Sequence, residues 1–422
     1  MDLLTWMTTL LRQPAIMVGI IAFIGLVAQK ERLSKIVLGT LKTTLGFLIL
    51  NIGIGAIVSN ISGWSGMFFE TFNLQGVFPS DEAATGALLA TLGTEIGAMM
   101  GLSMLISLIA ARILPWKNVY LSGHKHWGMC GIVSLTLSTL GLDSMTIILL
   151  GSVVVGIYMT TMPELIQPFV REVTGGKDDW SIGHVITGEF WISTLVAKLL
   201  GNKKNKVDDI KVPEDLEFFK DMALSSSICF ILLYIGTSLI AGPTIAMKYT
   251  GGMEPILWSF ITALGLVAGL LALIYGVKML LAEIVPAFNG ISKRLIPGAK
   301  PGLDIPVLMP YSPVGVLVGF ISMMIGWILI GMPLSGALTG IVSAPSMTAI
   351  FIGGGCVGVL GNAVGGARGT VIAGLVMGIT WPILSSTYAT ILPVTAGIAY
   401  LSPDNILVSA ILLGLGKLLG LA

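Results

Sequence analysis

The sequence predicts an all-α integral membrane protein, and its composition and hydropathy are the main observations behind this prediction. Hydrophobic residues make up 55% of the 422 residues and charged residues only 11%, and the mean hydropathy is +0.93. A soluble domain is usually about a quarter charged. The apolar residues form stretches of about 20, enough to cross a bilayer as a helix. A soluble fold is therefore excluded, and the net charge of +1 argues against a nucleic-acid partner.

Hydropathy predicts eleven transmembrane helices. They are expected near residues 14–29, 35–58, 96–114, 127–143, 145–165, 221–242, 255–283, 314–333, 346–364, 369–388 and 404–421. The segment 1–12 is amphipathic and continues into the first span without a small-residue cleavage site. We therefore expect it to be part of the mature chain rather than a signal peptide.

Basic residues between the spans predict the orientation. Lys30, Arg32 and Lys35 follow the first span, a lysine cluster at 203–206 follows the fifth, and Arg368 follows the ninth. The positive-inside rule assigns these positions to the cytoplasm. The N-terminus is then expected outside the cell, and the odd number of spans places the C-terminus inside.

One long polar stretch divides the chain. We interpret residues 1–422 as a single polytopic unit, in which residues 201–220 form a cytoplasmic linker. The two parts, 1–200 and 221–422, each hold about five spans, and the second also carries the final C-terminal helix. Two halves of similar size are typical of a duplicated transporter, so we predict two pseudo-repeats.

Two segments do not fit simple spans. Residues 76–95 mix apolar residues with Pro79 and several acidic residues, and residues 286–313 contain six prolines. Proline removes a backbone donor and breaks helices. Backbone opened in this way at membrane depth must line protein or water. We therefore predict re-entrant or broken hairpins in both segments.

Ionisable side chains inside a membrane cost several kcal/mol on insertion scales and need a partner or water. Those that fall in or near the predicted spans and hairpins include Asp81, Glu82, Glu95, His124, Lys125, His126, His184, Glu189 and Asp304. We expect His124, His184 and Asp304 to bind a hydroxylated solute. The alternative is that they form structural ion pairs or lie at the interface, where Lys125 and His126 are expected to face headgroups.

Other chemistries are less well supported. Two histidines and a carboxylate could hold a metal, but their spacing fits no standard motif, so neither a metal nor a cofactor is expected. The string Gly63-Trp64-Ser65-Gly66 resembles that of intramembrane serine proteases, with Ser65 as nucleophile, but falls in a predicted polar loop. The three cysteines are expected to be small buried hydrophobes.

Several motifs, in order along the chain, resemble the ascorbate-type IIC permease of the bacterial phosphotransferase system. They are SKIVLGTLKTTLGFLIL (34–50), VYLSGH (119–124), WSIGH (180–184), the tract 190–215 and AFNGISKRLIPGA (287–299) with Asp304 after it. The resemblance implies a homodimer in the bacterial inner membrane. It also implies a core transport domain that moves elevator-fashion against a dimerisation (V-motif) domain, and cytosolic IIB and IIA proteins that supply the phosphoryl group. The chain itself would not be phosphorylated.

The resemblance also implies site residues. His124 and His184 stand at the positions of the family's two substrate-contacting histidines, and Asp304 stands at its hairpin aspartate. The resulting prediction is a permease component for L-ascorbate or a related sugar or polyol.

This chain departs from the ascorbate pattern at four positions within the expected substrate site. Gly128 and Val185 replace glutamines, and Asp81 and Glu82 replace a Thr-Tyr pair. Two lost amides and an added carboxylate change the available hydrogen-bond donors, and a carboxylate facing an anionic solute would repel it. The alternatives are therefore a neutral sugar or polyol, a cation-coupled secondary transporter that uses Asp81, Glu82 or Glu95, and, more remotely, a hydrolase using Ser65.

Overall fold

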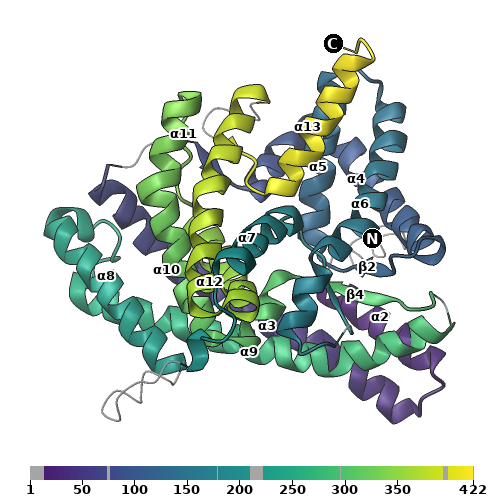
Figure 1. Ribbon diagram of the computed structural model, residues 1–422, viewed down its shortest axis with the longest axis horizontal. Coiled ribbons are helices and arrows are strands. Elements are labelled where there is room, and N and C mark those ends of the chain that lie inside the picture. The colour runs from purple at the N-terminus through teal and green to yellow at the C-terminus, as the bar shows by residue number, and fades with distance from the viewer. Residues whose placement is uncertain are drawn as a thin grey trace.

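The computed structural model describes residues 14–73, 77–177, 179–209, 222–294, 296–392 and 398–421 (Figure 1). Within these ranges, seven helices are long and apolar enough to cross a membrane. This agrees with the predicted all-α membrane fold, whereas the count of eleven spans stays a prediction. The segment 1–12, the linker residues 210–220 and the side chain of Glu82 lie outside what is described.

The helices occupy most of the described chain. In order they are α2 (Pro14–Ala28), α3 (Leu33–Thr71), α4 (Asp81–Ile113), α5 (Gly123–Thr139), α6 (Ser144–Val173), α7 (Thr187–Leu200), α8 (Met222–Ala246), α9 (Pro255–Arg294), α10 (Pro313–Ile325), α11 (Met332–Thr339), α12 (Met347–Ile391) and α13 (Pro403–Leu418). The 3₁₀ turns are η1 (Val207–Asp209) and η3 (Ile305–Tyr311), and a π-helical stretch, η4 (Gly326–Gly331), joins α10 to α11.

The second predicted span is longer than expected. Helix α3 continues to Thr71 and includes residues 63–66, so the predicted polar loop around Ser65 is wrong. Buried Trp64 explains the extension, because its ring stacks on Tyr234 at 5.0 Å and its Nε1–H donates to Thr237 Oγ1 at 2.9 Å. A tryptophan anchored in this way stabilises helix where hydropathy alone suggests a loop.

The ninth and tenth predicted spans form α12, which is broken at Gly366. The backbone of Gly366 has φ 61° and ψ −157°, a conformation that favours glycine. A Cβ atom placed on Gly361 would lie 2.5 Å from the carbonyl oxygen of Gly369, so the chain folds back at this point. The predicted boundary between the two spans is therefore correct to within a few residues.

The two predicted hairpins contain broken backbone. In the first, strand β1 (Phe78–Pro79) leads into α4, which is interrupted at Leu92 (φ −124°, ψ 16°). In the second, α9 continues through Pro286 to Arg294, so the first part of this segment is helical. The break comes later, where strand β4 (Lys300–Leu303) and η3 replace helix. Re-entry of either segment into the membrane stays a prediction.

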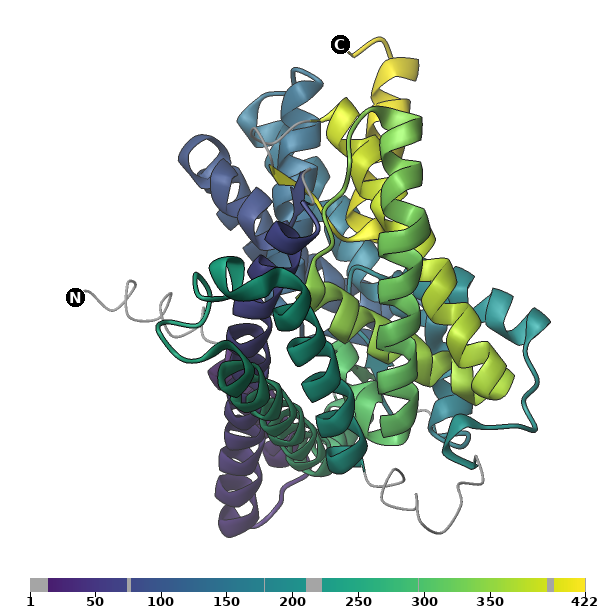
Figure 2. The same ribbon diagram turned by 90° about the vertical axis from the view of Figure 1, so that its left-hand side faces the viewer.

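Helices α2, α3 and α9 pack against one another, and α8 packs against α3 and α9. Figure 2 shows the purple N-terminal helices next to the green α8 and α9. Glycines allow the backbones of α3 and α9 to meet. A Cβ on Gly53 would lie 2.4 Å from Leu273 N, and one on Gly276 would lie 2.3 Å from Leu50 N. Such small-residue contacts are typical of membrane helices. Around α12 pack α7 and α10, while α4 and α5 pack against α6.

A small parallel sheet lies between these helices. Strand β4 is central, with β2 (Asn118–Tyr120) on one side and β3 (Ser181–Ile182) on the other. Gly302 pairs with both Tyr120 and Ser181. A second parallel pair joins β1 to β5 (Ile398–Ala399). In both sheets, strands from the first part of the chain pair with strands from the second.

Candidate functional site

Three predicted site residues follow the three strands of the central sheet. His124 comes after β2, at the start of α5, His184 lies in the short connection between β3 and α7, and Asp304 follows β4 directly. Because the strands are parallel, their carboxyl ends lie at one edge of the sheet. Residues 124, 184 and 304, far apart in sequence, are thereby brought together, as the resemblance implies.

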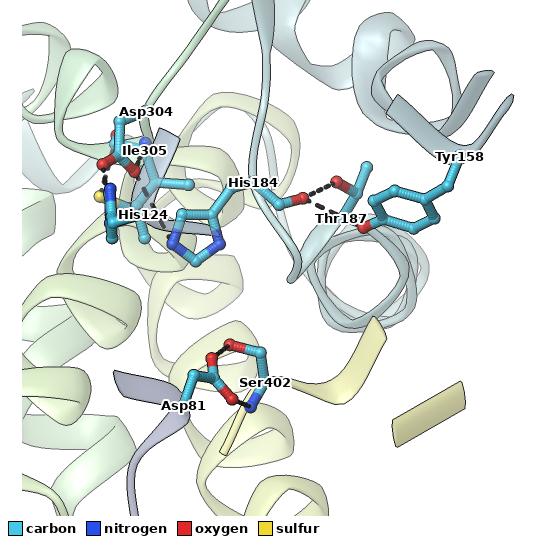
Figure 3. A network of polar contacts seen from close by, with 9 residues as sticks. Asp81, His124, Tyr158, His184, Thr187, Asp304, Ile305 and Ser402 are labelled. Atoms are coloured by element: carbon cyan, nitrogen blue, oxygen red, sulfur yellow. Dashed lines mark hydrogen bonds and ion pairs between the residues drawn. The ribbon is translucent and has the colours of Figure 1, made fainter. Parts of the chain in front are cut away.

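The two histidines approach different oxygens of one carboxylate (Figure 3). His124 Nε2 lies 3.4 Å from Asp304 Oδ2, and His184 Nε2 lies 3.7 Å from Asp304 Oδ1. Both distances exceed the 2.7–3.2 Å of a well-formed N–H···O bond. The side chain of His124 is 46% exposed, that of His184 is 7% exposed and that of Asp304 is 21% exposed. The cluster therefore has donors and acceptors that a hydroxyl group can engage.

The backbone around each residue is fixed. Asp304 caps η3, and its Oδ1 accepts a hydrogen bond from Ile305 N at 2.7 Å. The carbonyl oxygen of Ile305 accepts from Cys356 Sγ on α12 at 3.2 Å. The carbonyl oxygen of His184 accepts from Thr187 Oγ1 at 2.8 Å. These contacts fix the carboxylate and the imidazole relative to the helices that follow them.

Gly183 allows the strands at the site to approach closely. A Cβ atom there would lie 2.6 Å from the carbonyl oxygen of Gly302 and 3.2 Å from the ring of Tyr120. No side chain fits in that space without moving β4. By contrast, a Cβ on Gly123, the residue before His124, would meet nothing within 4 Å. Gly183 thus has a packing role that Gly123 lacks.

Polar contacts tie the sheet to α6. Asn118 Nδ2 donates to Thr160 O at 3.0 Å and to Glu164 Oε2 at 3.3 Å. Lys300 Nζ pairs with the same carboxylate at 3.3 Å. Glu164 therefore joins β2 and β4 to one helix and supports the edge at which the site lies.

Asp81 does not offer a free carboxylate. It is 1% exposed, and its Oδ1 accepts from Leu401 N at 3.0 Å and from Ser402 N at 3.1 Å, while Oδ2 accepts from Ser402 Oγ. Figure 3 shows this pair apart from the histidine cluster. Its position at the start of α4, beside the start of α13, makes it a structural tie between these helices.

The other departures from the ascorbate pattern lie nearby. Gly128 is one helical turn after His124, and a Cβ there would lie 3.4 Å from Asp81 Cβ. Val185 follows His184 and is buried. Glu95, which was considered as a cation ligand, lies further along α4, where its Oε1 accepts a hydrogen bond from Ser144 Oγ at 2.6 Å.

Two other candidate residues have structural partners. His126 was expected to face headgroups, and this is wrong, because it is 5% exposed and its Nε2 lies 2.7 Å from Ser103 Oγ. On a helix, positions two residues apart face different sides, so His126 points away from the side occupied by His124. Buried Glu189 accepts hydrogen bonds from Ser193 Oγ and Thr380 Oγ1.

Two buried polar residues at the start of α13 escaped the sequence analysis. Asp404 accepts hydrogen bonds from Tyr158 Oη at 2.7 Å and from Gly188 N at 3.0 Å. Asn405, next to it, is completely buried. Asp404 and Asn405 lie in the first turn of an apolar helix. An ionisable and an amide side chain at the start of such a helix are a signal that could have identified both residues.

The three site residues also offer donor atoms to a metal. One nitrogen from each histidine and one oxygen of Asp304 lie within 4.8 Å of one another. Zinc takes such ligands, but at about 2.0–2.2 Å each and usually with a fourth group. The expectation that no metal binds stays a prediction.

The structure offers no base for Ser65. Among the described residues, none is hydrogen-bonded to its hydroxyl, and the three histidines of the chain lie near Asp304 or Ser103 instead. A serine nucleophile needs a base within hydrogen-bond reach. The geometry therefore gives the hydrolase alternative no support.

Comparison with known proteins gives two matches. The profile of the EIIC-GAT family, described as "PTS system sugar-specific permease component", matches residues 9–404. The chain is also similar to the "Ascorbate-specific PTS system EIIC component" of Mycoplasma pneumoniae, with 25% identity in an alignment that is 421 residues long and covers 87% of this chain. The match spans 63% of the length of that relative.

Proposed function

Since the chain belongs to the family of sugar-specific permease components of phosphotransferase systems, we propose that it binds and translocates L-ascorbate or a related sugar or polyol. The observation that carries the proposal is the convergence of His124, His184 and Asp304 at one edge of the central sheet. The relative from Mycoplasma pneumoniae, whose printed name is ascorbate-specific, supports the choice of L-ascorbate as the first solute to test.

The chemistry of the cluster suits a polyhydroxylated solute. A carboxylate accepts hydrogen bonds from two neighbouring hydroxyls, and an imidazole both donates and accepts. The histidine–Asp304 distances of 3.4 and 3.7 Å are long enough that hydroxyls can compete for these groups. The solute would exchange its water hydrogen bonds for these contacts, so specificity would come from the positions of its hydroxyls.

The partnered state of Asp81 bears on the charge of the solute. Both oxygens of its carboxylate accept hydrogen bonds from Leu401 and Ser402, and Figure 3 shows this pair apart from the histidine cluster. An anionic solute such as ascorbate is therefore less strongly disfavoured than the sequence alone suggests. The missing amides at Gly128 and Val185 favour a solute with a different hydroxyl pattern. Anionic ascorbate and solutes with other hydroxyl patterns therefore both belong in the first binding screen.

The proposed transport cycle follows the family. The protein would act as a homodimer in the bacterial inner membrane, with the N-terminus outside and the C-terminus in the cytoplasm. A core domain bearing the site would move elevator-fashion against the dimerisation domain. A cytosolic IIB protein, recharged by IIA, would phosphorylate the solute as it emerges, and the chain itself would not be phosphorylated.

A binding screen combined with vesicle uptake tests this proposal. Purified protein is titrated with L-ascorbate, D-galactose and galactitol, and binding is measured by calorimetry and thermal shift. Uptake is then measured in vesicles with and without phosphorylated IIB. We expect saturable binding of one of these solutes and accumulation of its phosphate only with IIB.

The outcomes separate the proposal from its alternative. Accumulation of unmodified solute without IIB, abolished by an uncoupler, would establish a cation-coupled transporter instead. Absence of binding to all three probes would overturn the proposed solute class.

A further inference from the structure

Three of the positions at which this chain departs from the ascorbate pattern, Asp81, Gly128 and Val185, lie beside the start of α13, where Asn405 is. A Cβ placed on Gly128 would lie 3.7 Å from Asn405 Nδ2 and 3.4 Å from Asp81 Cβ. On the other side, the carbonyl oxygen of Val185 accepts a hydrogen bond from Asp404 N at 3.2 Å. The first turn of α13 therefore lies between the two positions that lack the glutamine amides.

The two carboxylates beside Asn405 are already engaged. Asp81 accepts hydrogen bonds from Leu401 and Ser402, the residues that lead into α13. Asp404 accepts from Tyr158 on α6 and from Gly188 in the first turn of α7. These contacts fix the start of α13 against three other helices. Asn405 is thus held in place by its neighbours.

The amide of Asn405 itself has no such partner. The residue is completely buried, and within the described part of the chain neither Nδ2 nor Oδ1 is hydrogen-bonded. A buried polar group without a partner costs about 1–3 kcal/mol. Leucine or alanine would avoid this cost at the start of an apolar helix. The retained amide therefore points to a ligand.

A second unpartnered atom lies on the residue next to Val185. His184 Nδ1 is buried and, among the described residues, has no hydrogen-bond partner, while Nε2 of the same ring faces Asp304. The imidazole can therefore contact the carboxylate with one nitrogen and a solute with the other. His184 precedes Val185 in the sequence. Asn405 follows Asp404, whose backbone N–H donates a hydrogen bond to the carbonyl oxygen of Val185.

We propose that Asn405 is a specificity-determining residue of this permease, whose amide binds hydroxyls of the solute where the ascorbate form uses glutamines. An amide offers both donors and an acceptor, as glutamine does. In this proposal the amide comes from α13, next to Gly128, instead of from α5 or from the residue after the second histidine. This inference rests on the proposed function, and it narrows the solute to one whose hydroxyls face α13.

The test compares Asn405→Leu and Asn405→Ala with Ser409→Ala. Leucine keeps the branched shape and the number of side-chain heavy atoms of asparagine, although it is larger, and removes every donor and acceptor, whereas alanine removes them without adding volume. Ser409 lies one turn further along α13, and its hydroxyl is hydrogen-bonded to Thr136 and Tyr388. Each purified variant is titrated with L-ascorbate, D-galactose and galactitol, and its thermal stability is measured without solute.

We expect both Asn405 variants to bind at least tenfold more weakly than the wild type, with an unchanged or raised Tm, because an unpartnered buried amide is removed. Ser409→Ala should lower Tm and leave Kd unchanged. This opposite pattern distinguishes a recognition residue from a structural one.

His184→Ala separates the failure of this inference from failure of the proposed site. If His184→Ala loses binding while Asn405→Leu keeps the wild-type Kd, Asn405 has no role in recognition. Unchanged binding in both overturns the site as a whole. If the wild type binds none of the three probes, the proposed solute class and this inference fail together.

Discussion

The carboxylate of Asp81 accepts a hydrogen bond from the backbone N–H of Ser402, at 3.1 Å and across 321 residues of sequence. The same oxygen accepts from Leu401 N at 3.0 Å. One acidic residue at the start of α4 thus fixes the turn that leads into α13. The sequence suggested a solute or cation ligand at this position, and the contacts instead indicate a tie between two helices.

Replacement of Asp81 by alanine should therefore destabilise the protein. Two buried backbone N–H groups would lose their acceptor, at a cost of about 1–3 kcal/mol each when unsatisfied. We expect a clear fall in Tm, measured by thermal denaturation in detergent. Glu95→Gln, on the same helix, keeps an oxygen for Ser144 Oγ and should change little. An unchanged Tm for Asp81→Ala would show that the tie is energetically unimportant.

The histidine–Asp304 cluster, as the candidate substrate site, gives the next prediction. His184→Ala and Asp304→Ala should each weaken solute binding at least tenfold, about 1.4 kcal/mol, because each removes a group from the cluster. Calorimetric titration with the solute found in the screen measures this. His126→Ala serves as the control, since it removes the contact with Ser103 and should lower Tm without changing Kd. Wild-type affinity in both site variants would refute the assignment.

The two glycines that precede the site histidines provide a matched pair. Gly183→Ala places a methyl group where a Cβ lies 2.6 Å from Gly302 O, whereas Gly123→Ala places one in open space. Overpacking of this kind typically costs about 1–3 kcal/mol. We expect Gly183→Ala to lower both Tm and solute affinity by moving His184, and Gly123→Ala to leave both near wild type. Equal effects of the two variants would contradict the predicted role of close strand packing.

The fold-back in α12 makes a prediction about stability alone. Gly366 has φ 61°, and a Cβ there would lie 2.3 Å from Asn202 O and from Asn205 O. Gly366→Ala should lower Tm strongly through both backbone strain and this clash. Gly242→Ala has a similar φ of 70° and ψ of 167°, with nothing within 4 Å of its Cβ, and isolates the backbone contribution. If the two variants lose the same stability, the contact with residues 202–205 contributes nothing.

Metal removal tests whether the histidine–Asp304 cluster binds a metal ion. Dialysis against EDTA should leave solute binding and Tm unchanged, because the proposed ligand contacts are hydrogen bonds. Metal analysis of the purified protein provides the parallel measurement. A loss of binding that zinc restores would show that the three side chains hold an ion.

The sequence predicted the membrane fold and the histidine–Asp304 cluster better than it predicted the ends of individual helices. Hydropathy located most helices because apolar length is what a bilayer demands. It failed at Ser65, where a buried tryptophan extends α3 into a polar stretch. The prolines of 286–313 do not by themselves locate the break either, because α9 continues through Pro286 to Arg294. Hydropathy does not register tertiary packing of the kind that extends α3.

At the candidate site, too, some residues could be predicted from the sequence and others could not. The resemblance identified His124, His184 and Asp304 as a set, and the parallel strands bring them together. Asp81 was misread because its partners, Leu401 and Ser402, are hundreds of residues away in sequence. Asn405 was missed for a similar reason, since its place beside Gly128 depends on how α13 packs against α5.

The order of strands in the central sheet has a consequence for biogenesis. Strands β2 and β3 do not pair with each other, since each pairs only with β4, which begins at Lys300. During synthesis, both outer strands therefore leave the ribosome long before their common partner exists. Their open backbone groups must be satisfied by temporary contacts until the second part of the chain is inserted. Assembly of the candidate site is thus a late step, because β4 and Asp304, which complete the sheet and the histidine cluster, are synthesised last.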